Sequence, residues 1–132
     1  IFGSQSIIVS IDYKKINGKP TLFKNYGKEL VEENIFDFIK KMEDVGAGEI
    51  LLNSIDRDGR ANGYDIDFIK TITSTVSIPV IACGGAGSNN DILKCFEKTK
   101  VDAVAAGNIF HFTENSYIEI KSFLKKHLKY IR

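Results

Sequence analysis

Short apolar runs alternate along the chain with stretches in which apolar residues recur every three or four positions. The apolar runs, which predict β-strands, lie at residues 5–11, 49–54, 79–83 and 101–106. The stretches between and after them have the spacing of amphipathic helices. Strands that alternate with such helices are typical of parallel βαβ units. The pattern therefore predicts four consecutive strand–helix units.

Local signals mark the ends of these elements. Asp65 and Ser88 stand where side chains that cap helix starts are expected, and Gly46 stands where the first helix should end. Asn17-Gly18 is a strong turn signal, and the strand-forming residues that follow it, Thr21, Leu22, Phe23 and Tyr26, predict a small hairpin in the first loop. The first strand is expected to stop at Asp12.

The length suggests what these units build. Dividing 132 residues by four units gives about 33 residues per unit, close to the roughly 31 per unit of a (β/α)₈ barrel of about 250 residues. We therefore expect residues 1–132 to form a single (β/α)₄ half-barrel, part of a longer barrel, since the sequence also begins with Ile1 rather than Met. The alternative is a small open α/β sandwich with strands in a doubly wound order.

Charge and cysteine content exclude several classes of partner. Eighteen basic and seventeen acidic residues give a formal net charge of +1, which argues against a nucleic-acid or acidic-membrane partner. The longest apolar runs are too short to span a bilayer, and no signal peptide is evident. Cys83 and Cys95 make no disulfide framework and fit a reducing compartment. We expect a cytoplasmic location.

Polar residues gather where the predicted strands end. Ligands of α/β folds bind beyond the carboxyl ends of parallel strands. Asp12 ends the first strand there, the segment from Asn53 to Asp58 ends the second, and Cys83 ends the third. A partly buried carboxylate is a candidate general acid or base, although Asp12 could equally cap a loop. Cys83 is expected to be a small buried side chain rather than a nucleophile, because no histidine is near it in sequence.

Two glycine-containing turns are candidate phosphate sites. Gly84-Gly85-Ala86-Gly87 precedes Ser88 and a helix, and glycines before a helix start let backbone N–H groups approach an anion. Glycine pairs also form ordinary strand-to-helix turns. If the chain is the second half of a barrel, this turn and Gly107-Asn108 follow strands seven and eight, whose loops commonly bind phosphate in such barrels. A short extra helix is then expected to start at Gly107.

Several motifs together resemble the cyclase subunit of imidazole glycerol phosphate synthase. The motifs are Phe2-Gly3-Ser4-Gln5, Ile11-Asp12, Gly46-Ala47-Gly48-Glu49-Ile50-Leu51-Leu52, Ile55-Asp56-Arg57-Asp58-Gly59, Gly63-Tyr64-Asp65, Gly84-Gly85-Ala86-Gly87 and Phe110-His111-Phe112. The resemblance covers nearly the whole chain and corresponds to strands five to eight, the C-terminal half of that barrel.

The resemblance implies a lyase of histidine biosynthesis that needs no cofactor or metal. The phosphorylated substrate PRFAR and ammonia from a glutaminase subunit or domain give imidazole glycerol phosphate and an aminoimidazole carboxamide ribonucleotide. The resemblance makes Asp12 one of two catalytic aspartates, the other belonging to a missing N-terminal half-barrel. Implied substrate contacts are Asn53, Asp58 and Cys83. Implied phosphate contacts are Gly59, Gly84, Gly85, Gly107 and Asn108. Glu49 corresponds to the ammonia entrance, and Gln5 lies near the surface where the glutaminase docks.

Departures from the family pattern leave other functions open. The family usually has Ser at the position of Cys83 and Ala-Ser at that of Gly107-Asn108, whereas Cys83 and Gly107 resemble a paralogous branch that amidates surface sugars with a glutaminase partner. A non-catalytic half-barrel that serves only in assembly is a third possibility. An isolated half-barrel exposes its apolar inner face and strand edges, so we expect self-association.

Overall fold

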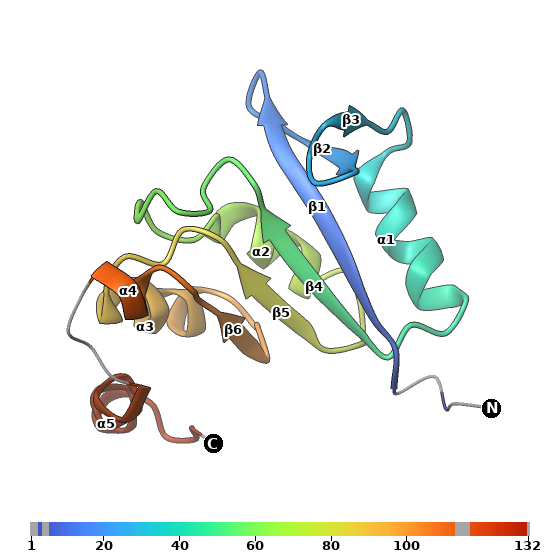
Figure 1. The fold of residues 1–132 in the computed structure, drawn as a ribbon. Coiled ribbons are helices and arrows are strands. Elements are labelled where there is room, and N and C mark those ends of the chain that lie inside the picture. The colour runs from blue at the N-terminus through green and yellow to red at the C-terminus, as the bar shows by residue number, and fades with distance from the viewer. Residues whose placement is uncertain (1–2, 4–5, 113–116, 132) are drawn as a thin grey trace.

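The computed structural model describes residues 3, 6–112 and 117–131, and only the backbone of residues 111 and 112. Figure 1 shows the elements in chain order. The strands are β1 Ile8–Ile16, β2 Lys19–Lys24, β3 Glu29–Leu30, β4 Glu49–Ser54, β5 Val80–Cys83 and β6 Ala103–Ala105. The helices are α1 Ile35–Asp44, α2 Ile66–Thr73, α3 Asn89–Lys98, α4 Ile109–Phe112 and α5 Tyr117–His127.

The sheet has the strand order of consecutive barrel units. Its strands follow the order β3-β2-β1-β4-β5-β6, and β1, β4, β5 and β6 pair in parallel with one another in sequence order. In a doubly wound sheet the order of the parallel strands reverses at a switch point. No such reversal occurs among β1, β4, β5 and β6, so that alternative is wrong. The fold is α/β, with four parallel strand–helix units arranged as half of a (β/α)₈ barrel.

The first strand differs from its prediction. It begins at Ile8 rather than residue 5 and continues past Asp12 to Ile16. The reason is the hairpin, which the sequence does predict: β2 pairs antiparallel with β1 from Asp12 to Ile16 and extends the strand. Asp12 therefore lies inside β1, close to the last residue of that strand that pairs with β4, Tyr13. β4 has the bounds predicted for the second parallel strand, whereas β5 and β6 are shorter than the predicted third and fourth parallel strands.

Helices cover one face of the sheet. The side chains of Ile11, Ile50, Leu52, Val80 and Ala82 point to this face and are at most 1% exposed. The Tyr13 ring, on the same face, contacts the Phe68 ring of α2 at 4.6 Å between centroids. In Figure 1, α2 and α3 lie behind the sheet. We call this the covered face; because it excludes water from large apolar side chains, it supplies most of the fold's stability.

The opposite face, which we call the open face, has no buried residue among the described residues of the four parallel strands. Strand pairing arranges its side chains in rows. The lowest row is Ile8 and Glu49; the middle row is Ser10, Leu51, Ile81 and Ala103; and the top row is Asp12, Asn53, Cys83 and Ala105. Because side chains alternate along a strand, Ser10 shares this face with Asp12, and Glu49 shares it with Asn53.

The helix ends follow two of the three predicted signals. Ser88 caps α3, where its side chain accepts a hydrogen bond from the Asp91 N–H. Gly46 follows the end of α1 with φ 97°, which a glycine adopts without strain. Asp65 does precede α2, but its side chain makes no capping hydrogen bond, so its predicted role is wrong. Within the described residues, no helix is long and apolar enough to cross a membrane.

Candidate functional site

Asp12 and Asn53 lie side by side in the top row of the open face. The Asn53 Nδ2 donates a hydrogen bond of 2.9 Å to the Asp12 Oδ1, and both side chains are half-buried. The hydrogen bond engages one of the two carboxylate oxygens of Asp12 and orients the group. The sequence predicted this proximity from the strand ends, and the structure shows it. That Asp12 acts in catalysis stays a prediction.

Cys83 occupies the next strand of the same row, paired in register with Asn53. Burial raises the pKa of its thiol, and the nearby Asp58 and Asp12 carboxylates raise it further. The thiol is therefore protonated at neutral pH, which does not suit a nucleophile. Of the two carboxylates that raise this pKa, that of Asp12 lies in the same row and that of Asp58 lies in the loop after β4.

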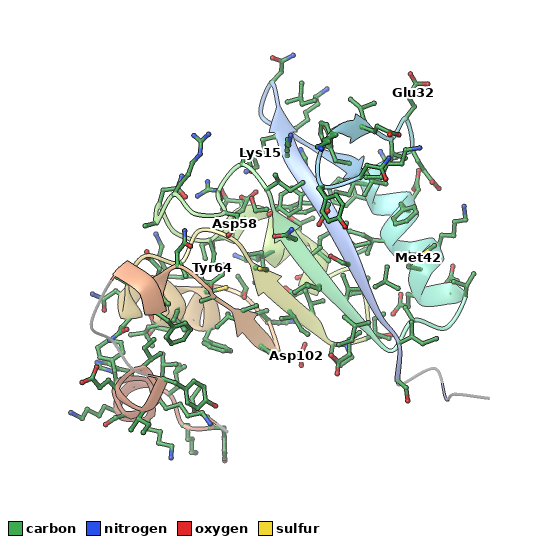
Figure 2. The ribbon with its side chains drawn as sticks, in the orientation of Figure 1. Lys15, Glu32, Met42, Asp58, Tyr64 and Asp102 are labelled. Atoms are coloured by element: carbon green, nitrogen blue, oxygen red, sulfur yellow. The ribbon has the colours of Figure 1, made fainter. Side chains whose placement is uncertain are left out.

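That loop, residues 55–65, is here called the β4 loop. At its start, Asp56 accepts hydrogen bonds from the Lys15 backbone N–H at 3.0 Å and the Ser54 hydroxyl at 2.9 Å. Burial alone would raise the pKa of Asp56, but these hydrogen bonds outweigh it and hold the pKa below its usual value. Figure 2 shows Lys15, Asp58 and Tyr64 at the same end of the sheet. Asp58 itself is exposed.

The glycine turn after β5 is locked to the β4 loop. The Gly63 N–H donates to the Gly85 carbonyl oxygen at 2.7 Å. A Cβ at Gly85 would collide with the Gly63 carbonyl, and one at Gly84 would lie 2.5 Å from the Ser54 carbonyl oxygen. Both glycines also have positive φ angles, 93° at Gly84 and 107° at Gly85. These glycines are therefore required for loop packing, whether or not they also bind phosphate.

The start of α3 is less available to an anion than the sequence suggests. Asp91 accepts hydrogen bonds from the Gly87 N–H at 3.1 Å and from the Ser88 hydroxyl at 2.9 Å. A carboxylate of this chain thus already interacts with the positive end of the helix. An anion at this site would have to bind the N–H groups nearer Gly85.

The loop after β6 reaches the β4 loop from the other side. A Cβ at Gly59 would lie 3.0 Å from the Asn108 Nδ2, so these two predicted phosphate residues are neighbours. Gly107 is exposed, and a Cβ placed there would meet no atom within 4 Å. The predicted short extra helix is present as α4, which begins at Ile109, two residues after the predicted start at Gly107. Phosphate binding by these residues stays a prediction.

The remaining candidates lie at the opposite end of the strands or outside the described residues. Glu49 is half-buried at the start of β4, paired with Ile8. Its predicted role at an ammonia entrance is not tested by this position. Gln5 lies outside the described residues. The described His, Cys, Asp and Glu side chains form no group of three or more arranged to hold a metal ion.

Sequence reasoning missed two contacts that join distant segments at this site. The Lys15 Nζ forms an ion pair of 2.7 Å with the buried Asp65. The Tyr64 hydroxyl donates to the Ala105 carbonyl oxygen at 3.1 Å, which ties the β4 loop to β6. The partners are 50 and 41 residues apart, so no local pattern could indicate them.

The fold, with its polar row at the carboxyl ends of the parallel strands, is that of an α/β half-barrel. The family model described as "Histidine biosynthesis protein" matches residues 1–116. The chain belongs to this family.

Curated relatives refine that placement. Imidazole glycerol phosphate synthase subunit HisF of Chlorobaculum parvum is 43% identical over 124 residues, which are 94% of this chain and 49% of the relative. HisF of Clostridium botulinum is 43% identical over 127 residues, covering 95% and 50%. HisF of a Thermotoga species is 42% identical over 126 residues, covering 96% and 49%. The chain spans about half the length of the curated relatives it matches.

Proposed function

We propose that this chain supplies the C-terminal half of the cyclase barrel of imidazole glycerol phosphate synthase. The complete barrel converts PRFAR and ammonia to imidazole glycerol phosphate and an aminoimidazole carboxamide ribonucleotide in histidine biosynthesis. The observation that carries the proposal is the juxtaposition of Asp12, Asn53 and Cys83 in one row, with Asp58 nearby, in a chain similar to HisF subunits. That similarity favours the cyclase over the sugar-amidating paralogue and over a non-catalytic assembly role.

In this proposal Asp12 is one member of the acid/base pair. Its half-buried position keeps the carboxylate close to a bound substrate, and Asn53 holds it in a defined orientation. The second aspartate comes from a preceding half-barrel, which also covers the open face. Asn53, Asp58 and Cys83 contact the substrate between the phosphates.

One terminal phosphate binds between the loops after β4, β5 and β6. Backbone N–H groups near Gly85 and Gly107 supply the donors, together with Gly59 and the Asn108 amide. No basic residue lies between Gly84 and Asn90, so peptide dipoles carry the recognition there. Ammonia comes from a glutaminase subunit that docks at the other end of the strands near Gln5, passes Glu49 and reaches Asp12 through the barrel. The assembly works in the cytoplasm.

Complementation tests this proposal directly. The chain is co-produced with residues corresponding to the first half of the Chlorobaculum parvum relative, and turnover of PRFAR is followed at high ammonium concentration. The expected result is ammonia-dependent formation of imidazole glycerol phosphate. Absence of turnover from a soluble, stoichiometric assembly would argue against a cyclase.

The variant Asp12→Asn then tests the assigned role. The asparagine oxygen still accepts from Asn53, so the change removes proton transfer while keeping the hydrogen bond. We expect kcat to fall by about 10²-fold or more with little change in substrate affinity. Ser10→Ala is the matched control, because Ser10 is exposed on the same face one row below. Near-normal turnover in Asp12→Asn would reduce Asp12 to a structural role.

A further inference from the structure

Lys15 contacts both ends of the β4 loop. Its backbone N–H donates to Asp56 at the start of the loop, at 3.0 Å. Its side-chain ammonium donates to the Asp65 Oδ1 at the end of the loop, at 2.7 Å. One residue of β1 therefore joins two positions nine residues apart in the loop, and Lys15 itself lies only three residues beyond Asp12.

The second of these contacts is partly buried. Asp65 is 3% exposed and the Lys15 side chain 29%. The Asp65 Oδ2 has no hydrogen-bond partner among the described residues, so the ion pair with Lys15 is the main compensation for burying this carboxylate. Removing one member of a buried pair leaves an uncompensated charge. The loop end is therefore strongly held at Lys15, in contrast to an exposed ion pair such as Lys24–Glu29, with side chains 61% and 51% exposed.

The segment between the two contacts carries the proposed substrate residues. Asp58 and Gly59 lie between Asp56 and Asp65, and both are exposed. Arg57 adds an internal brace, because its Nη1 donates to the Gly63 carbonyl at 3.0 Å. The position of this segment relative to Asp12 therefore depends on how firmly Lys15 holds its ends.

We propose that Lys15 is a positioning residue: through Asp56 and Asp65 it fixes the β4 loop relative to Asp12, so that Asp58 and Gly59 meet the substrate. This inference rests on the proposed function for its catalytic consequence. Its structural part, an ordered β4 loop, is independent of any activity.

Hydrogen exchange of the chain as it stands tests the structural part. In Lys15→Met the backbone N–H still reaches Asp56, but the ion pair is lost. We expect amide exchange in residues 57–64 to become about tenfold faster or more, with β4 and β5 unchanged. Lys15→Arg keeps the ion pair and should behave as the original chain, as should the control Lys24→Met. If Lys15→Met yields little folded protein, Lys15→Met/Asp65→Asn removes the unpaired buried charge and should show the same local effect.

Kinetics in the complemented enzyme test the catalytic part. Lys15→Met should raise the KM for PRFAR by about tenfold while kcat falls less, and Lys15→Arg should restore both. Unchanged exchange in residues 57–64, or faster exchange spread equally over the sheet, would overturn the inference. So would an unchanged KM in an assembly whose loop exchanges faster. An inactive assembly of the original chain would overturn the proposed function instead, and the exchange result would still decide whether Lys15 orders the loop.

Discussion

The two faces of the parallel sheet use neighbouring residues for different purposes. On the covered face Ile11, Ile50 and Leu52 are at most 1% exposed. On the open face Asp12, Leu51 and Asn53 alternate with them and are only half-buried. Since side chains of a strand alternate between faces, a shift of one residue separates a position that stabilises the fold from one that can meet a ligand. The difference shows why polar residues are tolerated within apolar strands here.

The open face also differs from an ordinary sheet surface. Its lowest and middle rows hold Ile8, Leu51 and Ile81, and Ile8 is 55% exposed. In a complete barrel such rows are filled by side chains from the other strands. The open face is therefore an apolar surface below a polar row, and substitutions on the two faces should have separable effects.

The largest expected effect concerns stability. Ile50→Ala on the covered face should lower the free energy of unfolding by about 2–5 kcal/mol, because a fully buried aliphatic side chain is removed. Leu51→Ala, one residue away on the open face, should cost less than half as much. Urea unfolding of both variants measures the difference. Equal losses would mean that the open face is packed in solution.

Self-association is the second expectation, and it concerns the open face alone. The apolar side chains of the open face and the outer edge of β6, the last strand of the described sheet, should bring two copies together at roughly tens of micromolar. Ile81→Lys places a charge in the middle row and should shift the equilibrium toward monomer. Sedimentation of both proteins measures this. A strict monomer in the original chain would contradict the expectation and show that the open face is compatible with water.

The division into two faces was predictable from the sequence, and the interlocking of the loops was not. Alternation placed Glu49 and Asn53 on one face, and helical spacing located α1 to α3, because both depend on neighbours in the chain. The extension of β1 past Asp12 depends on pairing with β2, and the role of Asp65 depends on Lys15, 50 residues earlier. A residue that looks like a helix cap can be recruited by a distant charge, and local patterns do not contain that information.

A smaller expected effect, a change in phosphate affinity, distinguishes glycines needed for folding from glycines available to a ligand. We predict that the isolated chain binds one phosphate weakly between its loops. Gly107→Val should weaken this binding by about tenfold, because its side chain enters open space beside the N–H donors. Asn108→Ala should weaken it only about threefold. Amide NMR shifts during phosphate titration measure both, with urea unfolding expected to be unchanged.

Gly85→Val also tests the same loops, but its interpretation differs. Its side chain would collide with the Gly63 carbonyl, so we expect loss of stability as well as of phosphate binding. Only Gly107→Val can therefore report on the anion site alone. Phosphate-induced shifts that are absent, or confined to other regions, would remove the phosphate assignment from these loops.

The smallest expected effect is a pH-dependent change in stability, and it concerns a residue that lies on neither face of the sheet. Glu43 at the end of α1 accepts hydrogen bonds from the Lys40 ammonium at 2.6 Å, and from the Ser77 hydroxyl and backbone N–H at 2.6 and 2.7 Å. Lys40 first and Ser77 second lower the pKa of Glu43 to about 2. A lowered pKa in the folded state means that the stabilisation is present above the unfolded value, near 4.5, and is lost as pH falls toward 2. Glu43→Gln should thus reduce stability at pH 7 by roughly 1 kcal/mol or less, and the difference from the original chain should shrink between pH 4.5 and 2. Thermal unfolding at pH 7, 4 and 3 measures this difference in stability. A difference that grows on acidification would contradict the assigned hydrogen bonds. Turnover in the complemented enzyme should be unaffected, because Glu43 lies far in the fold from the top row of the open face.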